Sequence, residues 1–396
     1  MKFDFRNPTR ILFGEDQEKE VGKLLQGYGA KRVLLLYGGG SIQRSGLYDI
    51  VTRSLKESHI EFVALGGVRP NPTAFFVREA LKIVREKEID FLLAVGGGSV
   101  IDTAKSIGVG AYYEGDPFDF NLKKAVPEKT MPVSVVLTIA SAGSESSNSC
   151  VIQDDETGIK QGFNSDLIRP VFAIENPKWA LTVPPYQVFA GASDIMMHSL
   201  ERYFNPSEEN QLADSWALDL IRSTMEAAKM LKANPKDLSA MGTLMLNSSL
   251  SHDGLTSIGK SSVFSVHPLE HALSGYRSSI THGAGVALLY PAWAKHVYHQ
   301  DLGKFTRLAK EVFGLLGAND EETAIMGIRA MKDFFSSIGM PSSFGEVGLT
   351  LSDVPALVSL ATGNGTRVVG RYPQPLEEKD VKTIYESLCK EGGISL

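Results

Sequence analysis

The sequence has few cysteines and no long apolar run. Its 396 residues include two cysteines, Cys150 and Cys389, so we expect no disulfide framework and predict a reducing, cytoplasmic location. The opening residues MKFDFRNPTRILFG lack the apolar core of a signal peptide. No apolar run approaches the roughly 18–20 residues that span a bilayer, so we predict no membrane association.

An excess of positive charge is also missing. The chain carries 40 Lys and Arg against 46 Asp and Glu, a formal net charge of -6. Nucleic-acid binding needs a basic surface that neutralises phosphates, so we predict no nucleic-acid partner. The hydrophobic share of 43% and the charged share of 22% are typical of an ordinary soluble globular protein.

The first half of the chain alternates between predicted strands and helices. FDF and RILFG near the start predict a short hairpin, and later apolar runs predict strands at 31–37, 60–67, 91–95 and 132–139. Helical patterns separate these later strands, which indicates a parallel sheet with helices on both faces.

The pattern changes near residue 183, where VPPYQVFAGASDIMMHSLERYF opens a long helical segment. Two prolines suit a helix start. Further helical patterns follow at 209–232, 236–251, 283–299, 302–316, 320–338, 351–362 and 376–391. We predict an α/β domain with a Rossmann-like parallel sheet over 1–183, and an all-α domain over 184–396.

Two glycine loops repeat one design. KRVLLLYGGGS at 31–41 and IDFLLAVGGGS at 89–99 are each a buried strand that ends in Gly-Gly-Gly-Ser. Backbone amides in such loops can approach phosphate oxygens closely. Neither loop fits the common dinucleotide or P-loop motifs, and one loop alone could be a tight turn. Two of them in adjacent units favour a nucleotide crevice, which the polar loop at 138–148 could also line.

Three of the eight histidines lie in SVHPLEHALSGYRSSITH at 265–282. HPLEH fits H-x-x-E-H, the peptidase pattern in which Glu270 would be the base. However, Pro268 disfavours the helical conformation at His267. A peptidase would also leave the glycine loops without a role.

A metal site assembled from two distant segments is the better hypothesis. Asp194 and His198 are four residues apart in an apolar helical segment, so they share one face and need polar partners. The site predicted from the residues is Asp194, His198, His267 and His282, with His271 beside it. Such nitrogen and oxygen ligands suit Fe(II) or Zn(II). The histidines expected to be solvated are His59, His252, His296 and His299.

These motifs resemble the iron-containing, or group III, alcohol dehydrogenases, which have the dehydroquinate-synthase-like fold. The resemblance runs nearly end to end and is carried by NPTRILFG, GGGSVIDTAKSI, the segment from TVPPY to ERYF, the histidine stretch and PQPLEEKDVKTIYESL. Within the family the chain is most similar to the butanol dehydrogenase and aldehyde reductase branch.

The resemblance implies roles for particular residues. Asp194, His198, His267 and His282 match the metal ligands. Catalytic roles are implied for His271, near the nicotinamide and substrate, and for Asp102, behind the pyrophosphate loop. The residues that would bind the cofactor are Gly38, Gly39, Gly40, Ser41, Asn71, Gly97, Gly98, Ser99, Asp102, Thr138, Ser144, Asn148, Lys160 and Leu181.

The implied activity is that of a metal-dependent, NAD(P)H-linked alcohol dehydrogenase and aldehyde reductase. A hydride would pass directly between a primary alcohol or aldehyde on the metal and nicotinamide C4. The first glycine loop contains no acidic residue and Arg44 follows it, so we predict NADP(H), with NAD(H) as the alternative. Fe²⁺ is the expected metal, Zn²⁺ is its alternative, and the family implies a homodimer.

Two other functions stay open from the sequence. One is a dehydroquinate-synthase-type lyase of the same fold, which uses a glutamate and two histidines as ligands. The other is a non-catalytic sensor of a nucleotide or metal. Asp194 with three histidines argues against the lyase, and NADPH oxidation with butyraldehyde would exclude the sensor.

Overall fold

We describe the protein from a computed structural model that covers residues 2–206, 210–261 and 263–390. Its packing divides the chain into two compact units. We call Arg6–Val183 with Lys236–Asp253 the α/β unit, and Met1–Phe5 with Pro184–Pro235 and Gly254–Leu396 the helical unit.

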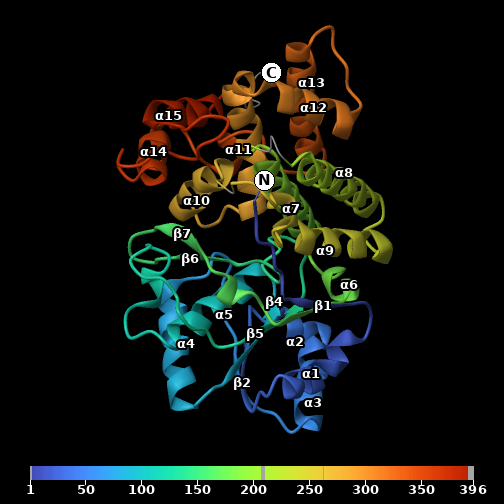
Figure 1. The fold of residues 1–396 in the computed structure, drawn as a ribbon, viewed down its shortest axis with the longest axis vertical. Coiled ribbons are helices and arrows are strands. Elements are labelled where there is room, and N and C mark those ends of the chain that lie inside the picture. The colour runs from blue at the N-terminus through green and yellow to red at the C-terminus, as the bar shows by residue number, and fades with distance from the viewer. Residues whose placement is uncertain (1, 207–209, 262, 391–396) are drawn as a thin grey trace. The chain divides into compact units, whose positions relative to one another are not determined.

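The α/β unit is built on a six-stranded sheet with the order β1-β8-β5-β4-β2-β3, of which Figure 1 labels β1, β2, β4 and β5. All neighbouring strands run parallel. The strands are β1 (Arg10–Phe13), β2 (Arg32–Tyr37), β3 (Glu61–Leu65), β4 (Phe91–Gly96), β5 (Val133–Leu137) and β8 (Phe172–Glu175). The predicted parallel sheet is therefore confirmed.

Both faces of the central strands are buried. Val33 and Leu35 of β2 pack with Leu25 and Val51 in one core cluster, while the intervening Leu34 is also fully buried. Successive side chains of a strand point to opposite faces. A strand buried on both faces needs an unbroken apolar run, as parallel sheets covered by helices do.

Helices complete this unit. They are α1 (Val21–Gly27), α2 (Ser41–Ser45), α3 (Leu47–Glu57), α4 (Ala74–Glu86), α5 (Gly98–Gly110), α6 (Pro177–Ala180) and α9 (Leu238–His252). Helix α5 packs against β4 and β5. This contact fixes the turn between β4 and α5, where one glycine loop lies.

The predicted opening hairpin is wrong. Strand β1 pairs in parallel with β8, with Ile11 opposite Ala173, and FDF forms no strand. The hydrogen-bonding edge of a distant strand therefore decides the pairing of this segment, which local alternation cannot reveal. Strand β8 was not predicted, nor was the antiparallel pair β6 (Ser149–Gln153) and β7 (Lys160–Asn164).

The predicted run of helices is confirmed, although the helix predicted at 236–251 is α9 of the α/β unit, and residues 209 and 391 of the predicted ranges lie outside the described residues. The helices of the helical unit are α7 (Pro185–Tyr203), α8 (Gln211–Ala233), α10 (Val266–Tyr276), α11 (His282–Val297), α12 (Leu302–Phe313), α13 (Asp320–Ser337), α14 (Val354–Thr362) and α15 (Glu378–Ser387). Helix α7 starts with Pro185, where the missing amide hydrogen costs nothing. It packs against α8 and α11, and α10 packs against α11, so α7, α10 and α11 are neighbours.

The domain boundaries at 1–183 and 184–396 stay a prediction. The compact units part at the same point, between Val183 and Pro184, but Lys236–Asp253, which contains α9, groups with the α/β unit. A search of the described ranges finds no helix with the length and apolar character needed to cross a membrane.

Candidate nucleotide site and metal centre

The two glycine loops follow neighbouring strands. Gly38, Gly39, Gly40 and Ser41 come directly after β2, and Gly97, Gly98 and Ser99 come directly after β4. These strands are parallel neighbours, so both loops emerge at the same edge of the sheet. From β2 the chain goes outward to β3 and then returns to β4 on the other side. The loops therefore lie at a topological switch point, where open parallel sheets bind their ligands.

Gly97 is required by packing. A Cβ atom at this position would lie 2.3 Å from Cγ2 of Ile139, which follows the adjacent strand β5. Thr138, the first residue after β5, donates its backbone N–H to the Gly96 carbonyl at 3.1 Å. The loop after β5 is thus held directly against the second glycine loop.

Asp102 and Ser144 are in direct contact. Ser144 Oγ donates to Asp102 Oδ1 at 2.6 Å, and the Val151 amide donates to Oδ2 at 2.9 Å. Burial raises the pKa of Asp102, although nearby Lys105 and these hydrogen bonds oppose the shift. The two oxygens of the carboxylate thus tie helix α5 to Ser144, which follows β5, and to Val151 of β6.

Lys105, which also lies in α5, holds the segment from Ser144 to Ser149 and was not predicted. Its fully buried ammonium donates to the carbonyl and hydroxyl oxygens of Ser144 and Ser147 and to the Ser149 carbonyl, at 2.7–3.2 Å. Burial lowers its pKa to about 8. The spacing of Asp102 and Lys105 in an otherwise apolar helix was the available signal.

The remaining predicted cofactor residues are spread over this unit. Lys160 Nζ donates to Asn71 Oδ1 at 3.0 Å, which joins two of them. Asn148 Nδ2 donates to Asp166 at 3.0 Å. Leu181 follows α6, directly after β8 and its short connection. The structure thus brings Asn71 together with Lys160, and Asp102 with Ser144, while Leu181 lies in a separate segment.

In the helical unit, three helices bring the predicted metal ligands together. Oδ1 of Asp194 lies 3.7 Å from His198 Nδ1, 3.7 Å from His267 Nε2 and 3.5 Å from His282 Nε2. Asp194 and His198 come from α7, His267 from α10 and His282 from the first residue of α11. The rings of His198 and His267 are stacked, with centroids 4.6 Å apart.

These separations fit ligands on one metal ion. Donor atoms about 2.1 Å from a tetrahedral ion lie about 3.4 Å from one another, close to the observed 3.5 and 3.7 Å. The distances are too long for hydrogen bonds. Asp194, His267 and His282 form a group whose donor atoms all lie within 4.8 Å of one another and could hold one ion, whereas His198 lies near Asp194 but is not part of that group.

The surroundings of His267 favour a positive charge. Burial disfavours a charged ring, but the carboxylates of Asp194 and Glu201 outweigh it and raise the pKa of His267 to about 9. A proton or a divalent cation can provide this charge. Because a metal ligand must be a neutral imidazole, the two compete, and the donor set fits a divalent cation.

Close approach of α11 to α7 depends on Gly283. A Cβ atom there would lie 1.8 Å from the carbonyl oxygen of Ala190. Any side chain would separate the two helices that carry His282 and Asp194. This explains the glycine that follows His282.

The peptidase pattern does not form. His267 is the second residue of α10 and Pro268 the third, as expected for a proline in the first turn. His267 Nε2 faces Asp194, while Glu270 contacts His282 Nδ1. His271 lies beside His282, with ring centroids 5.6 Å apart, and is not in the group around Asp194.

The expectation that four other histidines are solvated is only partly confirmed. His59 and His299 are exposed. His252 Nδ1 lies 2.8 Å from the Ala142 carbonyl oxygen, and His296 Nε2 lies 3.1 Å from Asp380. These two rings are half-buried and hold segments together.

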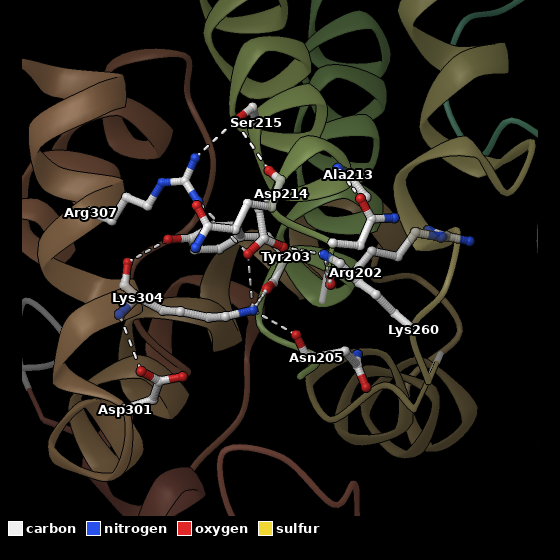
Figure 2. Close-up of polar contacts among 12 residues, drawn as sticks. Arg202, Tyr203, Asn205, Ala213, Asp214, Ser215, Lys260, Asp301, Lys304 and Arg307 are labelled. Atoms are coloured by element: carbon white, nitrogen blue, oxygen red, sulfur yellow. Dashed lines mark hydrogen bonds and ion pairs between the residues drawn. The ribbon is translucent and has the colours of Figure 1, made fainter. Parts of the chain in front are cut away.

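A buried ion network anchors the end of α7 (Figure 2). Lys304 donates to the Asn205 carbonyl at 2.6 Å and to the Tyr203 carbonyl, and Lys260 donates to the Arg202 carbonyl at 3.1 Å. Cations suit a helix C-terminus because its last carbonyls lack intrahelical partners. Asp214 pairs with both lysines, so the network fixes the helix that carries Asp194 and His198.

Comparison with known proteins gives the family. Residues 8–177 match the model of the iron-containing alcohol dehydrogenases, and residues 188–389 match the C-terminal model of the same family. The chain belongs to the iron-containing alcohol dehydrogenase family. It is accordingly an oxidoreductase of alcohols and aldehydes, and the family uses a nicotinamide cofactor with a divalent metal.

Individual relatives cover nearly the whole chain. It is 37% identical to NADH-dependent butanol dehydrogenase A of Clostridium acetobutylicum over 98% of this chain and 99% of that one. It is 31% identical to the NADPH-dependent aldehyde reductase YqhD of Escherichia coli over 93% and 95%. The crystal structure of NADH-dependent butanol dehydrogenase A from Thermotoga maritima superposes with a TM-score of 0.94, at 35% identity over 98% and 99%.

Proposed function

We propose that this protein reduces short aliphatic aldehydes and oxidises the matching primary alcohols, with the butanol and butyraldehyde pair among its substrates. The observation that carries the proposal is the placement of three imidazole nitrogens 3.5–3.7 Å from one oxygen of Asp194. Relatives named butanol dehydrogenase and aldehyde reductase support the substrate class.

In this proposal Asp194, His198, His267 and His282 hold one divalent ion, Fe²⁺, with Zn²⁺ as the alternative. When bound, the ion polarises the substrate oxygen, and the nicotinamide supplies or accepts the hydride. His271 lies beside His282 and is half-buried. We assign it the proton relay, because a neutral imidazole can accept at one nitrogen and donate at the other.

The cofactor is held by the predicted glycine loops and the residues near them. Gly38–Ser41 would bind the adenosine ribose end, and Gly97–Ser99 the pyrophosphate. Asn71, Thr138, Ser144, Asn148, Lys160 and Leu181 complete the proposed set. Asp102 belongs to this set and keeps its proposed catalytic role, which its contact with Ser144 of the same set supports.

We propose NADP(H) as the preferred cofactor. The first loop contains no acidic residue that would repel a 2′-phosphate, and Arg44 Nη1 lies 3.5 Å from where a Cβ of Gly40 would stand. The relatives divide on this point, since both NADH-dependent and NADPH-dependent enzymes are among them.

The cofactor proposal is tested by Arg44→Gln, with exposed Arg53→Gln as the matched control. Losing a charge-assisted contact to the 2′-phosphate should lower kcat/KM for NADPH by about tenfold, and leave NADH within about twofold. A parent enzyme that strongly prefers NADH would contradict the proposal.

The activity is tested by metal analysis and by NADPH oxidation with butyraldehyde. The parent should bind one Fe²⁺ or Zn²⁺ and oxidise NADPH. Asp194→Asn should lower both metal binding and kcat/KM by more than about 100-fold, because even residues behind the ligands cost 10–100-fold. Exposed Asp219→Asn is the control. Metal binding without NADPH oxidation across an aldehyde panel would favour a sensor instead.

The homodimer and the cytoplasmic location stay proposals as well. Strand β1 lies at the edge of the sheet in its strand order, which leaves one side for pairing with a second copy. Light scattering on the purified protein measures the mass, and a monomer at micromolar concentration would contradict the dimer.

A further inference from the structure

Two buried glutamates lie directly behind the metal-binding histidines. Glu201 Oε1 is 3.1 Å from His267 Nδ1, and Glu270 Oε2 forms a hydrogen bond with His282 Nδ1. Their exposed fractions are 4% and 0%. In both cases the carboxylate contacts the nitrogen opposite to the one that faces Asp194.

Glu201 also fixes the start of α10. The first amides of a helix need external acceptors, and the N-cap Ser265 does not supply one through its own side chain. Glu201 Oε2 accepts the Ser265 amide at 2.7 Å, and Oε1 accepts the His267 amide at 2.8 Å. One side chain of α7 therefore sets both the backbone position and the ring orientation of His267.

Helix α11 leaves room for the Glu270 side chain, because it has a glycine at position 285. A Cβ atom on Gly285 would lie 2.8 Å from Glu270 Cγ and 3.0 Å from its Oε1. Gly283 of the same T-H-G-A-G run is required for the contact with α7, whereas Gly285 is required for Glu270. The two glycines thus serve the ligand histidine and the carboxylate behind it.

We propose that Glu201 and Glu270 are positioning residues of the metal centre, which hold His267 and His282 with Nε2 directed at the ion. The inference rests on the metal site proposed above. A neutral imidazole has one N–H, and a carboxylate at Nδ1 keeps the hydrogen there, so that the lone pair stays on Nε2. The buried negative charges also make both rings better donors to a cation.

The test measures metal affinity rather than turnover. Chelator-treated parent, Glu201→Gln and Glu270→Gln are titrated with Zn²⁺ against a chromophoric chelator. An amide has the shape of the carboxylate but no charge, and it can donate to Nδ1 and so move the imidazole hydrogen to Nε2. We expect Zn²⁺ affinity to fall by about 10–100-fold in each variant.

The matched control is Glu175→Gln, because Glu175 is equally buried but lies in the α/β unit. Its Zn²⁺ affinity should stay within twofold of the parent. The visible spectrum of the Co²⁺-loaded proteins gives a second readout, since it should change in both test variants and not in the control. The thermal midpoints of the metal-free proteins show whether folding is intact.

Gly285→Ala tests the same idea while leaving the Glu270 carboxylate in place. The new methyl group should displace Glu270 and weaken Zn²⁺ binding. Gly303→Ala is its control, because the nearest atom to a Cβ there is 3.8 Å away. If Glu201→Gln fails to fold through loss of the α10 amide contacts, Glu270→Gln and Gly285→Ala decide the matter.

Folded Glu201→Gln and Glu270→Gln proteins that bind Zn²⁺ within twofold of the parent would overturn the inference. So would a parent that binds two equivalents, of which Glu270→Gln loses one, because Glu270 would then be a ligand together with His271 and His282. A parent that binds no Zn²⁺ or Co²⁺ would instead refute the proposed metal site itself.

Discussion

The buried cluster around Lys105 in the α/β unit and the buried cluster around the histidines in the helical unit are built on charges of opposite sign. In the α/β unit Lys105 is surrounded by serine oxygens, mostly of the backbone. In the helical unit three buried carboxylates, Asp194, Glu201 and Glu270, surround imidazoles. Oxygen atoms of the chain accept hydrogen bonds from the Lys105 ammonium, whereas the three carboxylates are best balanced by an added cation. The network around Lys105, whose hydrogen bonds are satisfied within the chain, therefore shapes a loop. The network around the histidines, which attracts a cation, forms a binding site.

Among Lys105→Met, Lys304→Met and Glu175→Gln, we expect Lys105→Met to have the largest effect. The uncharged side chain would leave the Ser144–Ser149 segment without its common donor, and each hydrogen bond to a charged group contributes about 1.5–3 kcal/mol. We expect cofactor affinity, measured by NADPH fluorescence, to fall by about 10–100-fold. Exposed Lys82→Met is the control.

Zn²⁺ affinity of Lys105→Met should remain that of the parent, because the metal centre belongs to the other unit. Unchanged NADPH binding in the folded variant would show that the lysine does not shape the cofactor loop. Loss of Zn²⁺ binding would show that the two units do not act separately.

Lys304→Met should have an intermediate effect. Burial lowers the pKa of Lys304 to about 8, yet its contacts with Asp214 and the carbonyls at the end of α7 hold the ammonium in place. Its removal should cost about 1–3 kcal/mol, seen as a fall of about 2–4 °C in Tm per kcal/mol. Lys310→Met, which affects an exposed ion pair, should change Tm by less than about 2 °C.

We expect Lys304→Met to lose stability while keeping most of its Zn²⁺ affinity. That result would separate the network that anchors α7 from the groups that touch the ligands. A variant with the Tm of the parent would show that the network contributes little to stability.

Glu175→Gln should have the smallest effect, and one that depends on pH. Burial and the neighbouring Glu145 raise the pKa of Glu175 to about 8. Ser249 Oγ lies 2.8 Å from Glu145 and 2.6 Å from Glu175, and since one hydroxyl donates one hydrogen, a protonated Glu175 completes the pair.

The folded protein then binds this proton more tightly than the unfolded chain, so stability should fall as pH rises from about 4.5 to about 8. Glu175→Gln should remove this dependence and raise Tm by about 2–8 °C at pH 8.5. Exposed Glu128→Gln should follow the parent. If Glu175→Gln and the parent have parallel Tm profiles between pH 5 and 8.5, Glu175 is ionised in the folded state.

The elements that sequence periodicity could predict are those with a strong local signal. The apolar runs before the two glycine loops, and the four-residue spacing of Asp194 and His198, are local, and the structure contains both. Strand β8 is only four residues long and β7 is polar, so neither has a pattern that differs from a loop. The opening hairpin was wrong because β1 is paired through a partner more than 150 residues away.

The candidate metal ligands could be predicted because histidine and aspartate in apolar helices need partners. The glutamates that contact the ligand histidines, Glu201 and Glu270, could not be predicted in this way. Glu201 and Glu270 look like ordinary helix glutamates in sequence. What distinguishes them is full burial against groups from other segments, which only packing reveals.

By itself the sequence determined the alternation of strands and helices, the position of both glycine loops and the shared face of Asp194 and His198, because these depend on backbone geometry over a few residues. The tertiary structure alone decided that β1 joins β8, that His267 and His282 meet at Asp194, and that two carboxylates stand behind them. These contacts join segments far apart in the chain. The close packing of α11 on α7 and α10 selects those of the metal centre, and the hydrogen-bonding edge of β8 selects the pairing of β1.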